Sequence, residues 1–430
     1  MPIASSSSPS SLRQLKPDAI VVGGGVIGVC CAYFLAKRGV QVAVLEREEI
    51  GQGASYGNAG VIAPGHAPIN RPGRIRQAIL SLADPLSPLY VAPRFDPALA
   101  AWLWRFARTC TESHAEFAMR TLGPLGHATS QLFDELMGSE QLVCGYKRQG
   151  YYEVYLTAPG LDGAIKEASW LRAFGYQPEI LSGSALRERE PALNGCVTGG
   201  VFHSAAATIN PYRFVRDLAD RAHRLGVIFR TGVEVSEVLV TGHRVKGVRT
   251  AAGEVMEADV VVLAPGAYGT RLLRMLGLKL PLQAAKGYHL DCKPAGVTTP
   301  LLRQACVLGE KLVFCTPMDD FVRFAGTLEF SGVNHQIRRP RLGQLTAAAK
   351  RYLMGDQGWK PFSEWCGLRP CLPDGLPAVG PVAACPGLYI ATGHAMQGLT
   401  LGPITGKLMA EYIVDGAPTL DIRALRPDRF

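Results

Sequence analysis

The stretch Ala19-Ile20-Val21-Val22-Gly23-Gly24-Gly25-Val26-Ile27-Gly28 decides the fold. Its first four residues are apolar and mostly β-branched, which predicts a short buried strand. Helical spacing follows the glycines from Val26 to Lys37, and Gly39 stops it. A second β-rich run, Gln41 to Glu46, ends on an acid. The stretch therefore predicts a strand–helix–strand unit of the kind that binds a dinucleotide.

Three glycines of this unit form a G-x-G-x-x-G motif. Gly23 permits the tight turn, Gly25 lets a pyrophosphate approach the backbone, and Gly28 lets the helix pack closely on the strand. Val26-Ile27 opens the helix, whose free N–H groups and partial positive charge attract a pyrophosphate. Glu46 lies 23 residues after Gly23. Its carboxylate can accept hydrogen bonds from both ribose hydroxyls and would repel a 2′-phosphate.

Two further glycine-rich loops favour FAD over a nicotinamide cofactor. The first follows the unit directly and offers small and polar residues for phosphate and flavin contacts: Gly53, Ala54, Ser55, Asn58, Ala59 and Gly60. The second precedes a helix predicted from about Pro403 to Ile413, and it contains Gly393, His394, Gly398, Leu399 and Thr400. Backbone N–H groups there can stabilise negative charge on a reduced flavin ring. A lone histidine such as His394 is more often structural than catalytic.

Composition narrows the class of protein. Of the 430 residues, 47% are hydrophobic and 19% charged, which indicates an ordinary globular protein with room for two domains. The net charge is +9, but the basic residues are scattered, so nucleic acid is a weak candidate partner. The 11 cysteines include no Cys-x-x-Cys pair, which argues against a disulfide framework and a metal site and favours the cytoplasm. No apolar run is long enough to span a membrane, so any membrane contact is expected to be peripheral, at the inner face.

The order of patterns along the chain predicts two interleaved domains. Residues 1–16 are Ser-rich and are interpreted as a flexible tail. A discontinuous FAD-binding domain of Rossmann type is expected to comprise residues 17–95, 195–275 and 362–430. A substrate domain built on an antiparallel sheet is expected to comprise 96–194 and 276–361. The predicted fold class is therefore mixed α/β.

The motifs together resemble the D-amino acid oxidase superfamily of FAD enzymes. The resemblance covers nearly all of the chain after Lys16 and rests on Gly23 to Gly28, Glu46 with Arg47, Gly53-Ala54-Ser55, Ala264-Pro265-Gly266 and Gly393-His394 with Gly398. Within the superfamily, Ser55 to Gly60 and Lys286-Gly287-Tyr288 are most similar to the bacterial D-amino acid dehydrogenases. Glycine oxidase and D-hydroxyproline dehydrogenase are also similar. Pro265 departs from the pattern, which commonly has Thr there.

The resemblance implies roles for several residues. It places the adenosine of an extended FAD on Glu46 and against the backbone of Val235. Gly367-Leu368-Arg369-Pro370 resembles the motif whose arginine holds the substrate carboxylate, and a guanidinium suits a carboxylate because it binds in a bidentate, fixed geometry. Tyr288 and Arg323, on predicted strands, are further candidate substrate contacts. Cys371 raises the alternative of covalently attached flavin, which we regard as the weaker interpretation.

The expected function is an FAD-dependent dehydrogenase of D-amino or D-imino acids, with D-proline and 4-hydroxy-D-proline among the candidates. The Cα hydride would pass to flavin N5, giving an imine, and electrons would go on to a quinone or an artificial dye. Two alternatives stay open at this point. One is an O₂-using oxidase of glycine or sarcosine type, and the other is a flavoprotein subunit without catalysis.

Overall fold

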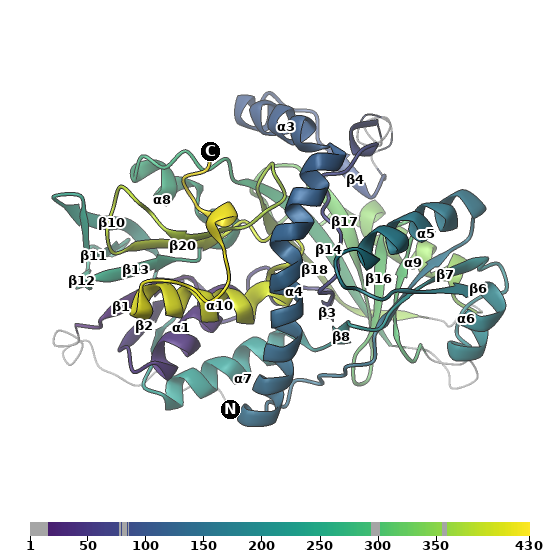
Figure 1. The fold of residues 1–430 in the computed structure, drawn as a ribbon, viewed down its shortest axis with the longest axis horizontal. Helices are drawn as coiled ribbons and strands as arrows, with labels where there is room; N and C mark the ends of the chain where they lie inside the picture. Colours follow the sequence, from purple (N-terminus) through teal and green to yellow (C-terminus); the bar gives the residue numbers. More distant parts are fainter. Residues whose placement is uncertain (1–15, 77–78, 80–83, 85, 294–301, 355–358) are drawn as a thin grey trace.

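A computed structural model describes residues 16–76, 79, 84, 86–293, 302–354 and 359–430. The tail predicted over residues 1–16 lies, apart from Lys16, outside the described residues. In Figure 1 the long helix α4 (Glu112–Glu140) crosses the middle of the molecule, with a six-stranded sheet on one side and a nine-stranded sheet on the other. Within the described part of the chain, the helices are too short or too polar to cross a bilayer.

The six-stranded sheet has the order β19-β20-β13-β1-β2-β9, and its neighbours run parallel except for β19 and β20. Its strands are β1 (Ala19–Val22), β2 (Val42–Leu45), β9 (Ile228–Arg230), β13 (Val260–Leu263), β19 (Ala378–Pro381) and β20 (Leu388–Thr392). Successive side chains of β1 enter two different cores, because a strand points its side chains alternately to opposite faces. Ala19 and Val21 pack toward the helices, whereas Ile20 and Val22 pack on the other side.

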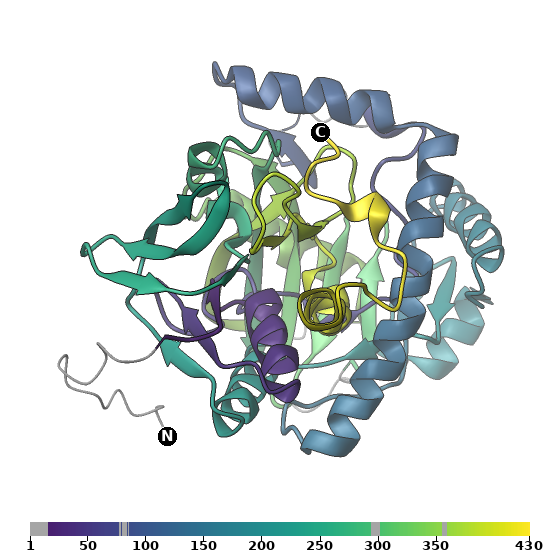
Figure 2. The same ribbon diagram turned by 60° about the vertical axis from the view of Figure 1, so that its left-hand side comes forward.

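Helices cover one face of this sheet and a small sheet covers the other. The helices of the first core are α1 (Val26–Lys37), α7 (Pro211–Arg224), α10 (Gly398–Asp415) and part of α4. Figure 2 shows α10 nearly end-on, with α1 and α4 on its two sides. The opposite core contains residues of an antiparallel sheet of β10 (Val235–Thr241), β11 (Arg244–Thr250) and β12 (Val255–Glu257).

The nine-stranded sheet has the order β18-β14-β17-β16-β15-β5-β7-β6, with β4 also paired to β17. Its strands are β4 (Leu89–Val91), β5 (Tyr151–Tyr155), β6 (Glu179–Ser182), β7 (Gly199–His203), β14 (Gln283–Lys293), β15 (Ala305–Leu308), β16 (Val313–Pro317), β17 (Val322–Phe330) and β18 (Lys360–Cys371). Most pairs are antiparallel, and only β15 with β5 and β17 with β4 run parallel.

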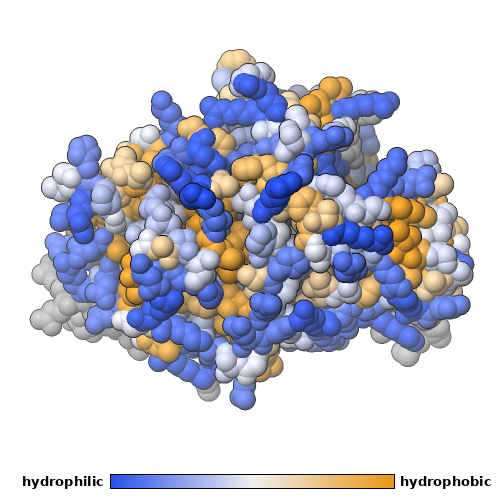
Figure 3. Space-filling model, viewed as in Figure 1, coloured by the Kyte–Doolittle hydropathy of each residue, from blue (hydrophilic) through white to orange (hydrophobic). Residues whose placement is uncertain are grey.

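The described structure also contains further strands and helices. They are β3 (Val61–Ile62), β8 (Ala207–Thr208), α3 (Pro97–Thr109), α5 (Ala158–Arg172), α6 (Gly183–Arg189), α8 (Thr270–Met275), α9 (Arg339–Tyr352), and the 3₁₀ turns η2 (Gly266–Tyr268) and η3 (Arg423–Leu425). The face of the molecule in Figure 3 is largely hydrophilic, with separate apolar patches between the polar side chains.

The strand–helix–strand unit is confirmed as β1, α1 and β2, and α1 has the expected bounds. The mixed α/β fold class is confirmed as well. The final helix begins at Gly398, and Pro403 lies within it. β4, β7 and β18, which the expected boundaries group with the cofactor domain, pair within the nine-stranded sheet. The division of the chain into domains stays a prediction.

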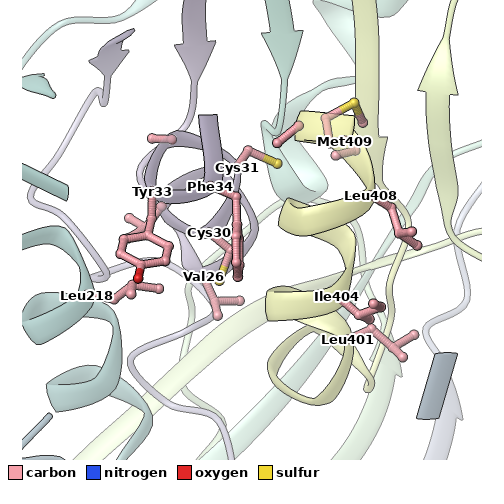
Figure 4. Packing of buried hydrophobic residues seen from close by; sticks show 14 of the residues in the cluster. Val26, Cys30, Cys31, Tyr33, Phe34, Leu218, Leu401, Ile404, Leu408 and Met409 are labelled. Carbon is pink, nitrogen blue, oxygen red and sulfur yellow. The ribbon is translucent and has the colours of Figure 1, made fainter. Parts of the chain in front are cut away.

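Helices α1 and α10 approach closely because α10 carries a glycine at the contact. A Cβ added at Gly406 would lie 2.5 Å from the carbonyl carbon of Cys30 on α1. Cys30, Ile404 and Leu408 belong to the same buried core, and Figure 4 shows the two helices side by side within it. The glycine therefore sets the distance between the two helices that cover the parallel sheet.

We expect Gly406→Ala to lower the free energy of unfolding by about 1 to 3 kcal/mol, because the added methyl group forces α10 away from α1. Urea unfolding followed by circular dichroism measures this change. Gly138→Ala is the matched control, since Gly138 lies in α4 with no atom near its added Cβ. That change should instead stabilise the protein, by about 0.5 to 1 kcal/mol. Equal effects of the two substitutions would contradict the packing argument.

Candidate active site

A cavity of about 610 Å³ lies where the two large sheets meet. The six-stranded sheet contributes the carboxyl ends of β1, β2 and β13, which is where open α/β sheets bind their ligands. The nine-stranded sheet contributes residues of β5, β15, β16, β17 and β18. Most residues expected to bind the cofactor line this cavity: Gly23, Gly25, Val26, Ile27, Glu46, Arg47, Ala54, Ser55, Asn58, Ala59, Val235, Ala264, Gly266, His394, Gly398, Leu399 and Thr400.

The glycine turn after β1 is shaped by close backbone contacts. Gly23 has a φ of +110°, and a Cβ there would collide with the carbonyl oxygen of Ala264. A Cβ at Gly28 would collide with the carbonyl oxygen of Gly23, so Gly28 acts in packing and does not line the cavity. The backbone N–H of Val26 donates to the Ser55 hydroxyl at 2.9 Å. The turn thus leaves the start of α1 open toward the cavity, which suits a pyrophosphate.

Glu46, at the end of β2, is held at the rim of this turn. Its carboxylate accepts hydrogen bonds from the backbone N–H of Gly24 at 2.6 Å and of Glu48 at 2.9 Å. Arg47 lies beside it, with its guanidinium 3.6 Å from the ring centre of Tyr268, a cation–π contact. The small open turn, the helix start and the oriented carboxylate fit the adenosine and pyrophosphate of a dinucleotide.

Gly60 and Gly393 do not line the cavity. Both have positive φ, at +76° and +81°, and a Cβ on Gly60 would lie 2.5 Å from the carbonyl oxygen of Ile209. The Asn58 side chain accepts the Gly60 N–H at 2.9 Å. These two glycines therefore shape the two glycine-rich loops, and their contact with the cofactor stays a prediction.

His394 is a buried neutral side chain at the cavity wall. Its Nε2 pairs with the Thr405 hydroxyl at 3.0 Å, while Nδ1 has no hydrogen-bond partner in the described structure. Burial lowers the pKa of His394 to about 3. The imidazole is therefore uncharged near neutral pH and is a weak base there.

Arg369 lines the cavity from the nine-stranded sheet. Its guanidinium lies over Gly287 of the neighbouring strand, where a Cβ would collide with it, and donates to the carbonyl oxygen of Thr327 on β17 at 2.9 Å. No carboxylate in the described ranges forms an ion pair with it. Burial lowers the pKa of Arg369 from its usual value. A partly buried cation without a counter-ion at a cavity wall is suited to an anionic ligand group.

Tyr288 lies outside the residues that line the cavity, and its role as a substrate contact stays a prediction. It is buried, and its hydroxyl donates to Glu329 at 3.0 Å. Glu329 also forms ion pairs with Lys286 at 3.2 Å and Arg341 at 3.1 Å, all three being almost fully buried. Tyr288 therefore belongs to a buried charge network of the nine-stranded sheet.

Arg323 also lies outside the residues that line the cavity, and its role as a substrate contact stays a prediction. It forms a bidentate ion pair with Asp291 on the adjacent strand, at 2.8 and 2.9 Å. Its remaining terminal nitrogen donates to the carbonyl oxygens of Tyr56 and Asn58, both at 3.0 Å. These carbonyls belong to the first cofactor loop, so Arg323 attaches that loop to the nine-stranded sheet.

The sequence patterns did not identify His289 and Trp365. His289 Nδ1 lies 3.2 Å from the carbonyl oxygen of Gly57, and its ring stacks on Trp365. Trp365 lines the cavity and covers Gly57 so closely that a Cβ there would collide with its ring. Cys371 is buried outside the cavity lining, in a small apolar cluster with Trp102. That position gives no support to covalent flavin attachment. Nowhere in the described ranges do three or more His, Cys, Asp or Glu side chains group as metal ligands.

The parallel sheet with its glycine turn, and the cavity between two sheets, are the features of a dinucleotide-binding protein. The chain belongs to the DAO family of FAD-dependent oxidoreductases, whose family model matches residues 18–412. The expected resemblance and FAD as the cofactor are thereby confirmed.

Similar proteins cover almost the whole chain. A D-amino acid dehydrogenase of Methylobacterium nodulans is 34% identical over 422 residues, 96% of this chain and 98% of that protein. One from Xanthobacter autotrophicus is 32% identical over 96% of this chain and 98% of that protein. Glycine oxidase of Geobacillus kaustophilus has a similar structure, with a TM-score of 0.77 and 22% identity over 96% of this chain and 99% of its own. L-proline dehydrogenase of P. horikoshii has a TM-score of 0.76 and 19% identity, over 96% and 98%.

We expect Arg323→Gln to weaken FAD binding, because two carbonyls of the cofactor loop lose their donor. The change also leaves Asp291 buried without a cation, which should lower the free energy of unfolding by about 3 to 5 kcal/mol. Fluorescence titration of the apoprotein with FAD measures the first effect, and urea unfolding measures the second. Arg339→Gln is the control, since Arg339 forms an exposed ion pair with Glu364. Its loss should cost at most about 1 kcal/mol and leave FAD affinity unchanged.

Proposed function

We propose that this protein is an FAD-dependent dehydrogenase that oxidises the Cα–N bond of a D-amino or D-imino acid. The observation that carries the proposal is the Arg369 guanidinium, which reaches the cavity without a carboxylate partner in the described structure. The relatives named D-amino acid dehydrogenase support the same reading, because they match over nearly their full length. D-Proline and 4-hydroxy-D-proline are included among the candidate substrates.

The proposed reaction uses the protein mainly for binding and orientation. Arg369 holds the substrate carboxylate, and the carbonyl oxygen of Thr327 fixes the guanidinium. A flavin held by the residues of the glycine turn and the two glycine-rich loops would supply the hydride acceptor, at its N5, for oxidation of the Cα–N bond. The substrate amine enters as the neutral form, and the imine product hydrolyses in water. His394, with its pKa lowered to about 3, does not carry the substrate proton near neutral pH.

In this proposal the two large sheets have different roles. Residues of the six-stranded sheet and of the loops at its carboxyl edge hold the cofactor, with adenosine toward Glu46 and Val235. The nine-stranded sheet carries Arg369 and forms the wall of the substrate site. The assignment keeps the predicted division into a cofactor part and a substrate part, except that Arg369, within residues 362–430 of the predicted cofactor domain, is assigned to the substrate part together with β18.

The electron acceptor in the proposal is a quinone or an artificial dye. All eleven cysteines are free thiols, which is compatible with the proposed cytoplasmic location and at most a peripheral contact with the membrane. An O₂-using oxidase would instead form hydrogen peroxide at the rate of substrate loss. A flavoprotein subunit without catalysis would keep its flavin bands when mixed with any amine. Anaerobic bleaching with D-, L- and N-methyl amino acids, including both hydroxyproline epimers, separates a catalytic flavoenzyme from the subunit without catalysis. Hydrogen peroxide formation compared with reduction of an artificial dye separates the oxidase from the dehydrogenase.

We expect Arg369→Ala to retain bound FAD and to lose turnover of amino acids, by a factor on the order of 100 or more in kcat/KM. The physical reason is that the substrate carboxylate would be buried without its bidentate donor. Arg369→Lys should recover only part of the activity, because an ammonium cannot form the bidentate pair. Steady-state kinetics with a dye acceptor and the flavin absorption spectrum give the two readouts. The control is Arg423→Ala, at a fully exposed arginine. Normal activity of Arg369→Ala would rule out the carboxylate role.

A further inference from the structure

One end of the cavity is polar and is not used by the proposed reaction. Tyr151, Glu153 and Tyr155 are alternate residues of β5, and all three line the cavity. A strand directs alternate side chains to the same face, so the three project together from the nine-stranded sheet. His203, on the adjacent strand β7, lines the same end. We call these four residues the β5 chamber.

Glu153 is a carboxylate whose neighbours in the chamber are mostly neutral. It accepts a hydrogen bond from the Tyr155 hydroxyl at 3.2 Å and a longer one from Tyr151 at 3.4 Å. Among the ion pairs of the described residues its partner is His203, whose Nε2 lies 3.8 Å away and is charged only when protonated. Burial opposes ionisation of Glu153, but the nearby imidazoles of His203 and His66 outweigh it, so the pKa of Glu153 lies below its usual value.

The chamber also has basic residues at its edge, and these are already engaged. Arg71 forms an ion pair with Glu167 at 2.5 Å. Arg74 lines the cavity as well and has interactions of its own. Glu153 therefore differs from Glu167, since it has no lysine or arginine partner in the described ranges. The aromatic rings of Tyr151 and Tyr155 lie on either side of it along the strand, and such rings attract cations.

The distance between Arg369 and Glu153 is set by the sheet. The Arg369 guanidinium reaches across β14 to the Thr327 carbonyl on β17. From β17 the next strands are β16, β15 and β5, so Glu153 lies three strand spacings farther, about 14 Å at the backbone. Ala325, Phe314 and Val307 are register partners along this path to Glu153, and all of them line the cavity. This row of register partners ends at Ala325, two residues from Thr327 along β17, so only a ligand with an extended side chain could contact both Arg369 and Glu153.

Opposite charges therefore stand at two points of one cavity, each without a strong partner of its own. A partly buried charge without a strong ion-pair partner is stabilised when a ligand supplies the opposite charge. We propose that Glu153, flanked by the rings of Tyr151 and Tyr155, is a specificity site for a substrate side chain that ends in an amine or a guanidine. This inference rests on the proposed function, because Arg369 must hold the carboxylate for the side chain to point toward β5. A cyclic imino acid would be too short to reach the chamber.

The test compares side chains of similar length and different charge on the unmodified protein. Anaerobic flavin bleaching is measured with D-arginine, D-lysine, D-norleucine, D-glutamate, D-proline and 4-hydroxy-D-proline. We expect kcat/KM for D-arginine or D-lysine to exceed that for D-norleucine by a factor on the order of 100. Preference for D-glutamate would assign the chamber to Arg71 and Arg74 and overturn the proposal. Preference for the imino acids, or equal rates for charged and apolar side chains, would overturn it too.

Two variants test whether the Glu153 carboxylate causes the preference for a cationic side chain. In Glu153→Gln the advantage of the cationic side chain should disappear, while kcat/KM for D-norleucine stays within about twofold. Glu179→Gln is the matched control, because Glu179 is an exposed glutamate of the same sheet, paired with Arg189. Retention of the cationic preference in Glu153→Gln would contradict the assignment even if the proposed reaction is correct.

Failure of the proposed function gives a different pattern. In that case no amino acid bleaches the flavin, whether Arg369 is present or replaced by Ala. Binding can then still be measured through the change in the flavin absorption spectrum with D-arginine and D-norleucine. Tighter binding of D-arginine that depends on Glu153 supports the chamber independently of catalysis, and equal binding of the two excludes it.

Discussion

The cavity depends on the attachment of the first cofactor loop to the nine-stranded sheet. Side chains from two adjacent strands contact the three successive carbonyl oxygens of residues 56–58, two through Arg323 and one through His289. The ion pair of Arg323 with Asp291 fixes the guanidinium, and its burial makes this geometry costly to lose. A loop held by its carbonyls on one side presents its other side to the cavity. The position of residues 56–58 against the nine-stranded sheet thus follows from one buried ion pair and one imidazole.

Two arginines on this sheet differ in which groups neutralise their charge. Arg323 has every side-chain nitrogen engaged by Asp291 or by the loop, so its charge is satisfied within the protein. Arg369 has one backbone carbonyl as its hydrogen-bond partner and faces the cavity. A charge satisfied internally holds the fold together, whereas a charge left for a ligand selects that ligand. The charge of Glu329 is likewise satisfied within the protein, because Lys286 pairs with it and the Tyr288 hydroxyl donates to it.

The sequence predicted those parts of the structure that depend on local contacts. The glycine turn, α1 and Glu46 follow from steric and hydrogen-bonding rules within about thirty residues, and the structure confirms the strand–helix–strand unit. The two faces of β14 could not be distinguished in the same way, since nearly every residue of that strand is buried and the alternation disappears. Tyr288 of β14, and Arg323 of the equally buried β17, were therefore expected at the cavity, whereas both lie outside its lining. β18 was missed because its prolines, glycine and exposed first half obscure a strand pattern.

The sequence patterns did not identify the residues of the β5 chamber as part of a site, because residues far apart in the sequence come together there. The strand arrangement that brings them together also bears on how the site selects a ligand. Glu153 is separated from Arg369 by more than two hundred residues in sequence, but by a fixed number of strands in space. The number of strands between two side chains sets their distance, because strand spacing hardly varies. A sheet that carries a cation at one strand and a carboxylate at another therefore discriminates ligands by the separation of their charges. In this fold the cofactor loops can keep their positions while substitutions on β5, β15 or β16 change which side chain is accepted, since none of those strands contributes to the glycine turn or to the contacts that hold residues 56–58.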